Sequence, residues 1–168
     1  MLIARIGPIP GAMGQQWNHI ATSCHFASVF WLFHDEFGRV PTQNEFLRMA
    51  DLTGAIRRML PFGTRLNKPA AGHLVLTPGN IVVFVHDNQP VHSCSALDAN
   101  TLAGYNQVNW FKVQGENHRY TTHQTNEIRW GEGLWHGNEV TGNVGQWCKL
   151  IAIPERPAKA VIRSMVQG

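Results

Sequence analysis

A short polar run breaks directly into an apolar one near the beginning of the chain, over residues 22–33. The aromatic side chains of this segment recur at helical spacing, at Phe26, Phe30 and Phe33. The periodicity predicts a buried helix of about four turns over residues 23–36. Cys24 therefore lies at the N-terminus of this helix, where unpaired backbone N–H groups and the helix dipole favour an anion.

A thiol in that position loses its proton more readily, and the thiolate is the nucleophile in cysteine chemistry. The alternative is that Cys24 is a small buried hydrophobe, as most free cysteines are. The chain has three cysteines, which cannot all pair and show no CxxC spacing, so a disulfide framework is not expected. We expect Cys24 to be the most reactive thiol, and Cys94 and Cys148 to be buried and slow to react.

The composition is that of a globular protein, with 43% hydrophobic and 15% charged residues, and it suits one domain over residues 1–168. The formal net charge is +3, and Arg57 and Arg58 form the only adjacent pair of Lys or Arg. We therefore expect no nucleic-acid-binding surface. The sequence shows no membrane-spanning run and no signal-peptide pattern, which predicts a cytoplasmic protein or one secreted without a cleavable signal.

Helical patterns come first along the chain. Thr42 and Glu45 have the spacing of a capping box, which predicts a second helix from this point to about residue 51. A short third helix is predicted over residues 55–60, where Pro61 stops it.

Strand patterns follow. Residues 81–85 are β-branched and apolar, which predicts a central strand, and residues 91–97 and 102–113 predict two more. A hairpin turn at residues 98–100 would join the last two into an antiparallel meander. Helices first and a meander second predict an α+β fold.

The rest of the chain gives weaker signals. Residues 115–146 are rich in Gly, Asn, Thr and His, so we expect long loops with a short strand near residues 127–130. Residues 146–153 predict a last strand, and residues 158–166 predict a short surface helix. The histidines of this polar region are expected to be solvated, namely His118, His123 and His136.

A cysteine nucleophile needs a histidine to activate it. His92 lies inside a predicted strand beside small residues, which leave room for the Cys24 helix to pack across it. His86 competes, but it precedes a turn and is expected to face solvent. His92 and Cys94 could ligate a metal, but alternate strand residues supply two ligands and zinc takes four, so no metal or other cofactor is expected.

Two short motifs carry a resemblance to a known superfamily. Residues 23–28, Ser-Cys-His-Phe-Ala-Ser, resemble the papain-type nucleophile motif, in which a small residue, the cysteine and an aromatic residue begin a helix. Residues 77–84 and 92–97 resemble the Pro-Gly-Asp strand and the histidine strand of NlpC/P60 and CHAP amidases, which belong to the same papain-like superfamily. The chain departs from these patterns at Asn80, where Asp is usual, and at His25, where an aromatic residue is usual.

The resemblance implies roles for further residues. Cys24 would be the nucleophile and His92 the base. Asn18 lies six residues before Cys24, at the position of the papain oxyanion glutamine, and Gln16 is the nearby alternative.

The resemblance also implies a polar residue on the next strand that orients the histidine. Asn106 and Asn109 are the candidates, and they lie on opposite faces of one strand, so only one can act. A three-residue hairpin loop over residues 99–101 would favour Asn106, whereas a two-residue loop would favour Asn109.

The predicted function is a cysteine-dependent amide hydrolase with a Cys-His-Asn triad. The substrate would be a peptide, a protein or peptidoglycan, and the reaction would be proteolysis, peptidoglycan amidase or endopeptidase activity, or deamidation of protein glutamine. The size and the missing signal resemble toxin and effector domains of bacterial secretion systems, which implies a possible immunity protein. The alternative is a non-enzymatic module that binds peptide or glycan through the tryptophan-rich residues 110–147.

Overall fold

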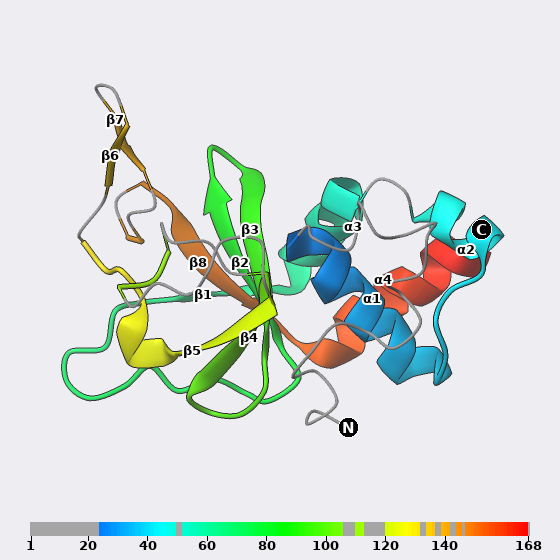
Figure 1. Ribbon diagram of the computed structural model, residues 1–168, viewed down its shortest axis with the longest axis horizontal. Helices are drawn as coiled ribbons and strands as arrows, with labels where there is room; N and C mark the ends of the chain where they lie inside the picture. The colour runs from blue at the N-terminus through cyan, green and yellow to red at the C-terminus, as the bar shows by residue number, and fades with distance from the viewer. Residues whose placement is uncertain are drawn as a thin grey trace.

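The computed structural model is an α+β fold, in which helices cover one face of an antiparallel sheet (Figure 1). The structure describes residues 24–49, 52–105, 110–112, 120–131, 134–136, 139–141, 144–145 and 147–167. The predicted fold class is confirmed at the level of α+β, while the papain-like assignment stays a prediction. None of the described helices is long and apolar enough to cross a bilayer.

The helices lie close to their predicted positions. They are α1 (Cys24–Phe37), α2 (Gln43–Arg48), α3 (Leu52–Met59) and α4 (Glu155–Gln167), with single 3₁₀ turns η2 (Leu60–Phe62) and η3 (Thr125–Glu127). The first helix begins at Cys24, as predicted, and Gly38 follows its end in a left-handed conformation with φ of 69°. Glycine adopts that conformation without strain, which explains why the helix stops there.

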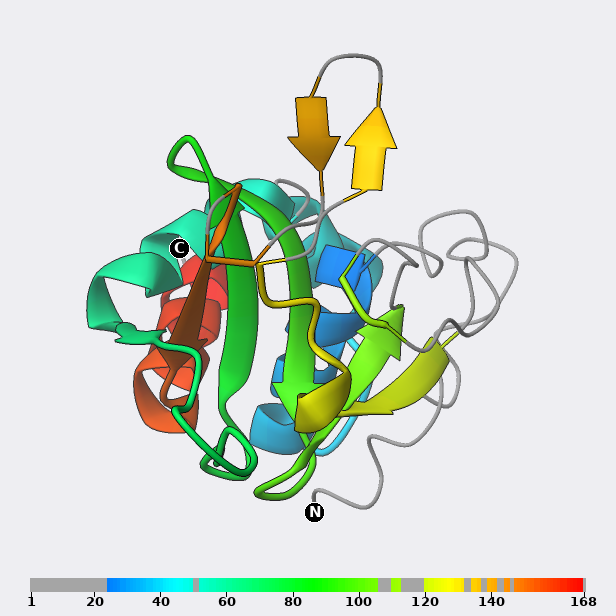
Figure 2. The same ribbon diagram turned by 90° about the vertical axis from the view of Figure 1, so that its left-hand side faces the viewer.

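The main sheet has six strands, and every neighbouring pair is antiparallel. In spatial order they are β1 (Thr64–Leu66), β8 (Lys149–Ile153), β2 (Ile81–His86), β3 (Gln89–Ala96), β4 (Thr101–Tyr105) and β5 (Tyr120–Gln124). The predicted meander is confirmed as β2, β3 and β4. A separate two-stranded hairpin, β6 (Leu134–His136) and β7 (Glu139–Thr141), projects from the sheet (Figure 2).

Strand prediction fails where polar residues alternate with apolar ones. Within the strand predicted over residues 102–113, the structure describes β4 up to Tyr105, while residues 110–112 form a turn and a single bridge. Conversely, β5 lies in a segment predicted as loop. Its backbone pairs fully with β4, so hydrogen bonding to a buried neighbour overrides its polar composition.

Two hydrophobic cores lie on opposite faces of the sheet. The core on the helical face joins α1, α3 and α4 to β2 and β8, through residues such as Phe30, Phe33, Ile56, Ile81, Val83 and Ile162. The core on the other face is closed by the segments after β4, through residues such as Val82, Phe84, Leu102, Phe111, Ile128 and Leu150. Alternate residues of β2 thus face different cores, as strand geometry requires.

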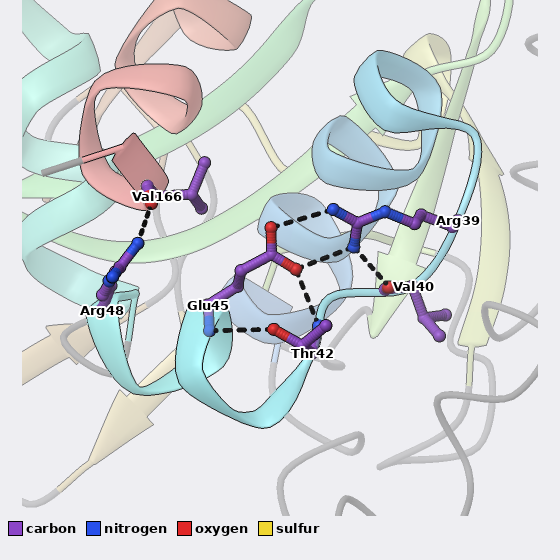
Figure 3. Close-up of polar contacts among 6 residues, drawn as sticks. All are labelled: Arg39, Val40, Thr42, Glu45, Arg48 and Val166. Atoms are coloured by element: carbon purple, nitrogen blue, oxygen red, sulfur yellow. Dashed lines mark hydrogen bonds and ion pairs between the residues drawn. The ribbon is translucent and has the colours of Figure 1, made fainter.

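The capping box at the beginning of α2 is confirmed (Figure 3). The Thr42 N–H donates to Glu45 Oε1 at 2.9 Å, and the Glu45 N–H donates to Thr42 Oγ1 at 3.3 Å. The Arg39 guanidinium also donates to both carboxylate oxygens of Glu45. This side-chain hydrogen bonding lowers the pKa of the Glu45 carboxyl to about 2.

The helix predicted over residues 158–166 is confirmed as α4, but its predicted place at the surface is wrong. Helix α4 buries Ala158, Ile162, Met165 and Val166 against α1 and α3. It is joined to the other helices by Arg163, which donates to Glu36 at 2.7 Å, and by Arg48, which donates to the Val166 carbonyl. The apolar spacing of its buried residues makes it part of the core.

Candidate functional site

Cys24 is the first residue of α1, and it is the most exposed of the three free thiols. Cys24 is partly exposed, whereas Cys94 and Cys148 are buried, as predicted. Helix α1 packs across β3 and β4, so the expectation that this helix lies over the His92 strand is confirmed. The thiol at the tip of α1 is therefore positioned against the beginning of β3.

Burial raises the pKa of the Cys24 thiol above its ordinary value of 9.0. Hydrogen bonds from the backbone N–H groups of Ser93, His25 and Cys24 itself oppose this rise, because they stabilise the thiolate. The sequence led us to expect a lowered pKa from the helix terminus alone. The structure shows that desolvation is the larger effect, so the resting thiol is neutral at pH 7.

The Ser93 contact fixes where the Cys24 sulfur lies. Backbone N–H groups of a strand lie in the plane of the sheet, and β4 pairs with β3 only at Ser95 and Ala96. The Ser93 N–H is therefore available to the sulfur at the side of β3. Cys24 thus meets the strand at its edge, beside the residues that precede Ser95.

A hydrogen-bonded cluster holds the first turn of α1 on β3. His25 Nδ1 lies 2.8 Å from Ser93 Oγ, and His25 Nε2 lies 3.1 Å from the Pro90 carbonyl oxygen. Ser28 Oγ lies 2.9 Å from Ser93 Oγ and 3.1 Å from the Cys24 carbonyl oxygen. The sequence prediction gave none of these three side chains a role.

The carbonyl of Pro90 fixes the tautomer of His25. A carbonyl oxygen only accepts, so Nε2 carries the hydrogen. Burial lowers the pKa of the His25 imidazole, so the ring is neutral at pH 7 and Nδ1 accepts from the Ser93 hydroxyl. Both ring nitrogens are therefore engaged in joining α1 to β3.

His92 lies on the face of the sheet that points away from α1. Its backbone pairs with Phe84, and its ring centroid lies 5.2 Å from that of Phe84 and 5.7 Å from that of Trp110. The ring is fully buried, and the adjacent side chain that faces α1 is Ser93. Cys24 and His92 thus approach the same stretch of β3 from different sides, and their pairing as nucleophile and base stays a prediction.

The remaining predicted site residues lie outside the described residues: Asn18, Gln16, Asn106 and Asn109. The turn before β4 does bear on the choice between the two downstream asparagines. The Leu97 N–H donates to the Thr101 carbonyl, so the loop has three residues, 98–100, one position earlier than expected. Even-numbered residues of β3 and β4 therefore lie on the same face of the sheet. The prediction that favoured Asn106 over Asn109 assumed this same arrangement.

Two other histidines differ from their predicted surroundings. His86 is half-buried rather than solvated, and its ring stacks on Trp147 at 3.8 Å between centroids. His123 is 5% exposed, and its Nδ1 lies 2.7 Å from Glu127 Oε2. The prediction of a solvated His123 is wrong because β5 turns this side chain into the core beside Phe111, while the even-numbered Thr122 and Gln124 face outward.

The tryptophans divide between core and surface hollows. Trp110 is 4% exposed and packs in the core, whereas Trp130 and Trp147 are half-buried and line hollows. Within the part of the chain that the structure describes, no group of three or more His, Cys, Asp or Glu side chains is placed to hold a metal ion. The site is therefore built from a thiol, backbone N–H groups and the cluster around Ser93.

No family model, no curated protein and no solved structure matches the chain.

Proposed function

We propose that the chain is a cysteine-dependent amide hydrolase with Cys24 as its nucleophile. The observation that carries the proposal is the position of Cys24, which is the first residue of α1 and the one thiol of the three that is not buried. Backbone N–H groups of Ser93 and His25 favour its thiolate form, because they lower the pKa that burial raises. Such donors stabilise negative charge at the place where cysteine chemistry develops it. The buried thiols of Cys94 and Cys148 have no access to a substrate.

The reaction needs a base, because the resting thiol is neutral. His25 is unsuited, since its two ring nitrogens are bonded to Ser93 and Pro90. We assign the base to His92, which is the neighbour of Ser93 along β3. For this role its ring must reach the edge of β3 on which the Cys24 sulfur lies.

The chemical steps follow from these assignments. His92 takes the thiol proton as the sulfur attacks the substrate carbonyl carbon and the carbonyl oxygen becomes an oxyanion. The carbon–nitrogen bond then breaks, and the imidazolium gives its proton to the leaving nitrogen. Water attacks the thioester with the same histidine as base, which releases the carboxylic acid and restores the thiol.

The carbonyl belongs to a peptide bond of a protein or of peptidoglycan, or to a glutamine side chain. We also propose, as the sequence led us to expect, that the protein is an effector or toxin delivered by a bacterial secretion system. The producing cell would then carry an immunity protein. The non-enzymatic alternative uses residues 110–147 as a binding surface and gives Cys24 no special chemistry.

Acyl transfer from an activated ester tests the proposal without knowledge of the substrate. The protein is incubated with a p-nitrophenyl ester, and intact-mass spectrometry follows the acyl adduct on Cys24. We expect turnover in the native chain and in Cys148→Ala, none in Cys24→Ala, and a loss of about a hundredfold or more in His92→Ala. Each variant is checked by its melting temperature.

Acylation that persists in Cys24→Ala would reject the nucleophile, and acylation unchanged in His92→Ala would reject the base. Equal labelling of Cys24 in folded and unfolded protein, with no turnover, would support the binding module.

A further inference from the structure

A groove lined by basic side chains runs over the end of the sheet where β1 and β8 meet. Its central hollow has a volume of about 210 Å³ and is lined by Arg65, Lys68, Lys149 and Trp130. A second hollow of about 150 Å³ shares Lys68 and Trp130 with it and adds Lys112. A third of about 350 Å³ shares Arg65 and Lys149 with it. Neighbouring hollows therefore adjoin one another, and we call the three together the basic groove.

The charge of the basic groove is not neutralised within the described chain. Arg65, Lys68, Lys112 and Lys149 are exposed, and among the described residues no carboxylate forms an ion pair with any of them. Asp87 is the one described acidic residue that lines a hollow, at the far end of the third. Like charges gathered in one hollow repel each other, and an anionic ligand relieves that repulsion.

The central hollow of the basic groove has an apolar floor. Leu66, Val144 and Leu150 line the central hollow, and the half-buried Trp130 forms part of the wall of two hollows. A small apolar hollow with cationic side chains around it and along the adjoining hollows suits a chain in which carboxylates flank apolar side chains. A single-stranded nucleic acid instead needs successive free aromatic faces, and one face of Trp147 is already covered by His86.

The basic groove extends toward the candidate active site. Its third hollow reaches Asp87 and Asn88, which form the turn between β2 and β3. The strand that leaves this turn carries Pro90 and Ser93, which hold the first turn of α1. The β2–β3 turn and the beginning of α1 lie toward the same end of the sheet (Figure 2).

We propose that the basic groove binds an acidic segment of the substrate protein, in which carboxylates alternate with apolar side chains. This inference rests on the proposed function, because it names the substrate class of the same site. The carboxylates pair with Arg65, Lys68, Lys112 and Lys149, and an apolar side chain fills the central hollow between them.

Fluorescence anisotropy with a labelled peptide of alternating glutamate and leucine tests the inference. The titration uses Cys24→Ala protein, so that binding is measured without turnover. We expect saturable binding that weakens as salt rises, and a loss of about tenfold in affinity for Lys68→Glu and for Lys149→Glu. Arg58→Glu is the matched control, because it makes the same charge change on an exposed residue of α3 that lines no part of the groove. Its affinity should stay close to that of the parent.

Melting temperatures establish that the variants fold, and Lys149→Met, which keeps the aliphatic stem without the charge, replaces any variant that does not. Equal losses in Arg58→Glu and Lys149→Glu would overturn the inference, because they would reflect net charge alone. Tighter binding of a single-stranded oligonucleotide or a sulfated polysaccharide, with the same dependence on Lys68 and Lys149, would also overturn it. If the peptide binds as expected but the ester assay fails, the groove stands as a peptide site and the hydrolase does not. If the ester is turned over but the peptide does not bind, the inference that the groove binds an acidic segment is rejected and the proposed hydrolase activity stands.

Discussion

The side chains of His25 and Ser93 are joined by a 2.8 Å contact between Nδ1 and Oγ, although 68 positions separate them along the chain. Because Ser93 also contacts Ser28 and gives its backbone N–H to the Cys24 sulfur, one residue of β3 sets the position of the whole first turn of α1. The candidate nucleophile is thus positioned by the strand as much as by its own helix.

Replacement of Ser93 by alanine should destabilise the protein by about 1–3 kcal/mol, because it leaves buried polar atoms of His25 and Ser28 without their partner. Urea unfolding measures the change. Ser95→Ala is the matched control, since Ser95 is equally buried on the same strand and should cost less. A larger loss for Ser95→Ala would show that the Ser93 cluster contributes little to stability.

Alkylation of Cys24 by iodoacetamide should accelerate as the pH rises from 7 to above 9. The reason is that burial raises the pKa of its thiol, and only the thiolate reacts. Peptide mass spectrometry should show Cys24 labelled first, because burial also raises the pKa of Cys148 to about 12 and leaves Cys94 inaccessible. Rapid labelling of Cys24 at mildly acidic pH would instead reveal an imidazolium partner in the resting protein, and earlier labelling of Cys94 would identify a different nucleophile.

A fall in pH should lower the free energy of unfolding, because His25 becomes protonated more readily in the unfolded chain than in the folded protein. Burial lowers the pKa of its imidazole below 6.5, so the unfolded chain takes up the proton first as the pH falls. The stabilisation is present above pH 6.5 and is lost as the pH falls through the lower, folded-state pKa. Urea midpoints at pH 7.5 and 5.5 should therefore differ more for the native chain than for His25→Gln. Equal pH dependence in the two proteins would assign the effect to other groups.

Glu45→Gln should destabilise the protein by about 1 kcal/mol at pH 7, because the cap and its pairing with Arg39 weaken. This value is well below what the pKa of about 2 would suggest, since the Arg39 side chain is 49% exposed and solvent screens the pair. The Glu45 pKa is lowered, so the contribution is present above about pH 4.5 and disappears as the pH falls toward 2. Thermal melts at pH 7 and 3 measure the difference. Thr42→Val, which removes only the cap hydroxyl, should show a loss that changes little with pH.

Asn106→Ala and Asn109→Ala should have different effects on acyl transfer. The sequence favours Asn106 as the residue that orients His92, and the described part of β4 has the parity on which that prediction was based. We therefore expect Asn106→Ala to slow turnover with little change in melting temperature, and Asn109→Ala to leave the rate of the folded protein unchanged. The reverse result would move the role to Asn109, and no effect of either would remove this part of the papain-like pattern.

The periodicity of the sequence was sufficient to predict α1 and the meander, because both bury residues at regular intervals. It could not predict β5, whose Thr and His residues pair with β4 through the backbone alone. The insertion of β8 between β1 and β2 joins segments distant along the chain, and local patterns carry no information about such pairing.

The candidate site also has features that could be predicted from local sequence patterns and features that could not. The position of Cys24 at a helix terminus follows from local patterns, and so does the burial of the other thiols. The face of the sheet on which the His92 side chain lies does not follow from local patterns. Residues 92–95 are His, Ser, Cys and Ser, and neither the even-numbered pair nor the odd-numbered pair is clearly apolar. The structure assigns Ser93 and Ser95 to the helical face and His92 to the other, a choice that depends on Phe84 and Trp110.

The central place of β8 in the sheet also governs when the site can form. During synthesis the β2–β4 meander leaves the ribosome before β8, so β1 has no neighbour until β8 has emerged, and both cores lack residues of β8 until then. Helix α1 meanwhile lacks α4, which completes its packing. A nascent chain thus carries Cys24 on an unfinished support, and any chemistry at this thiol waits for the last strand to be released.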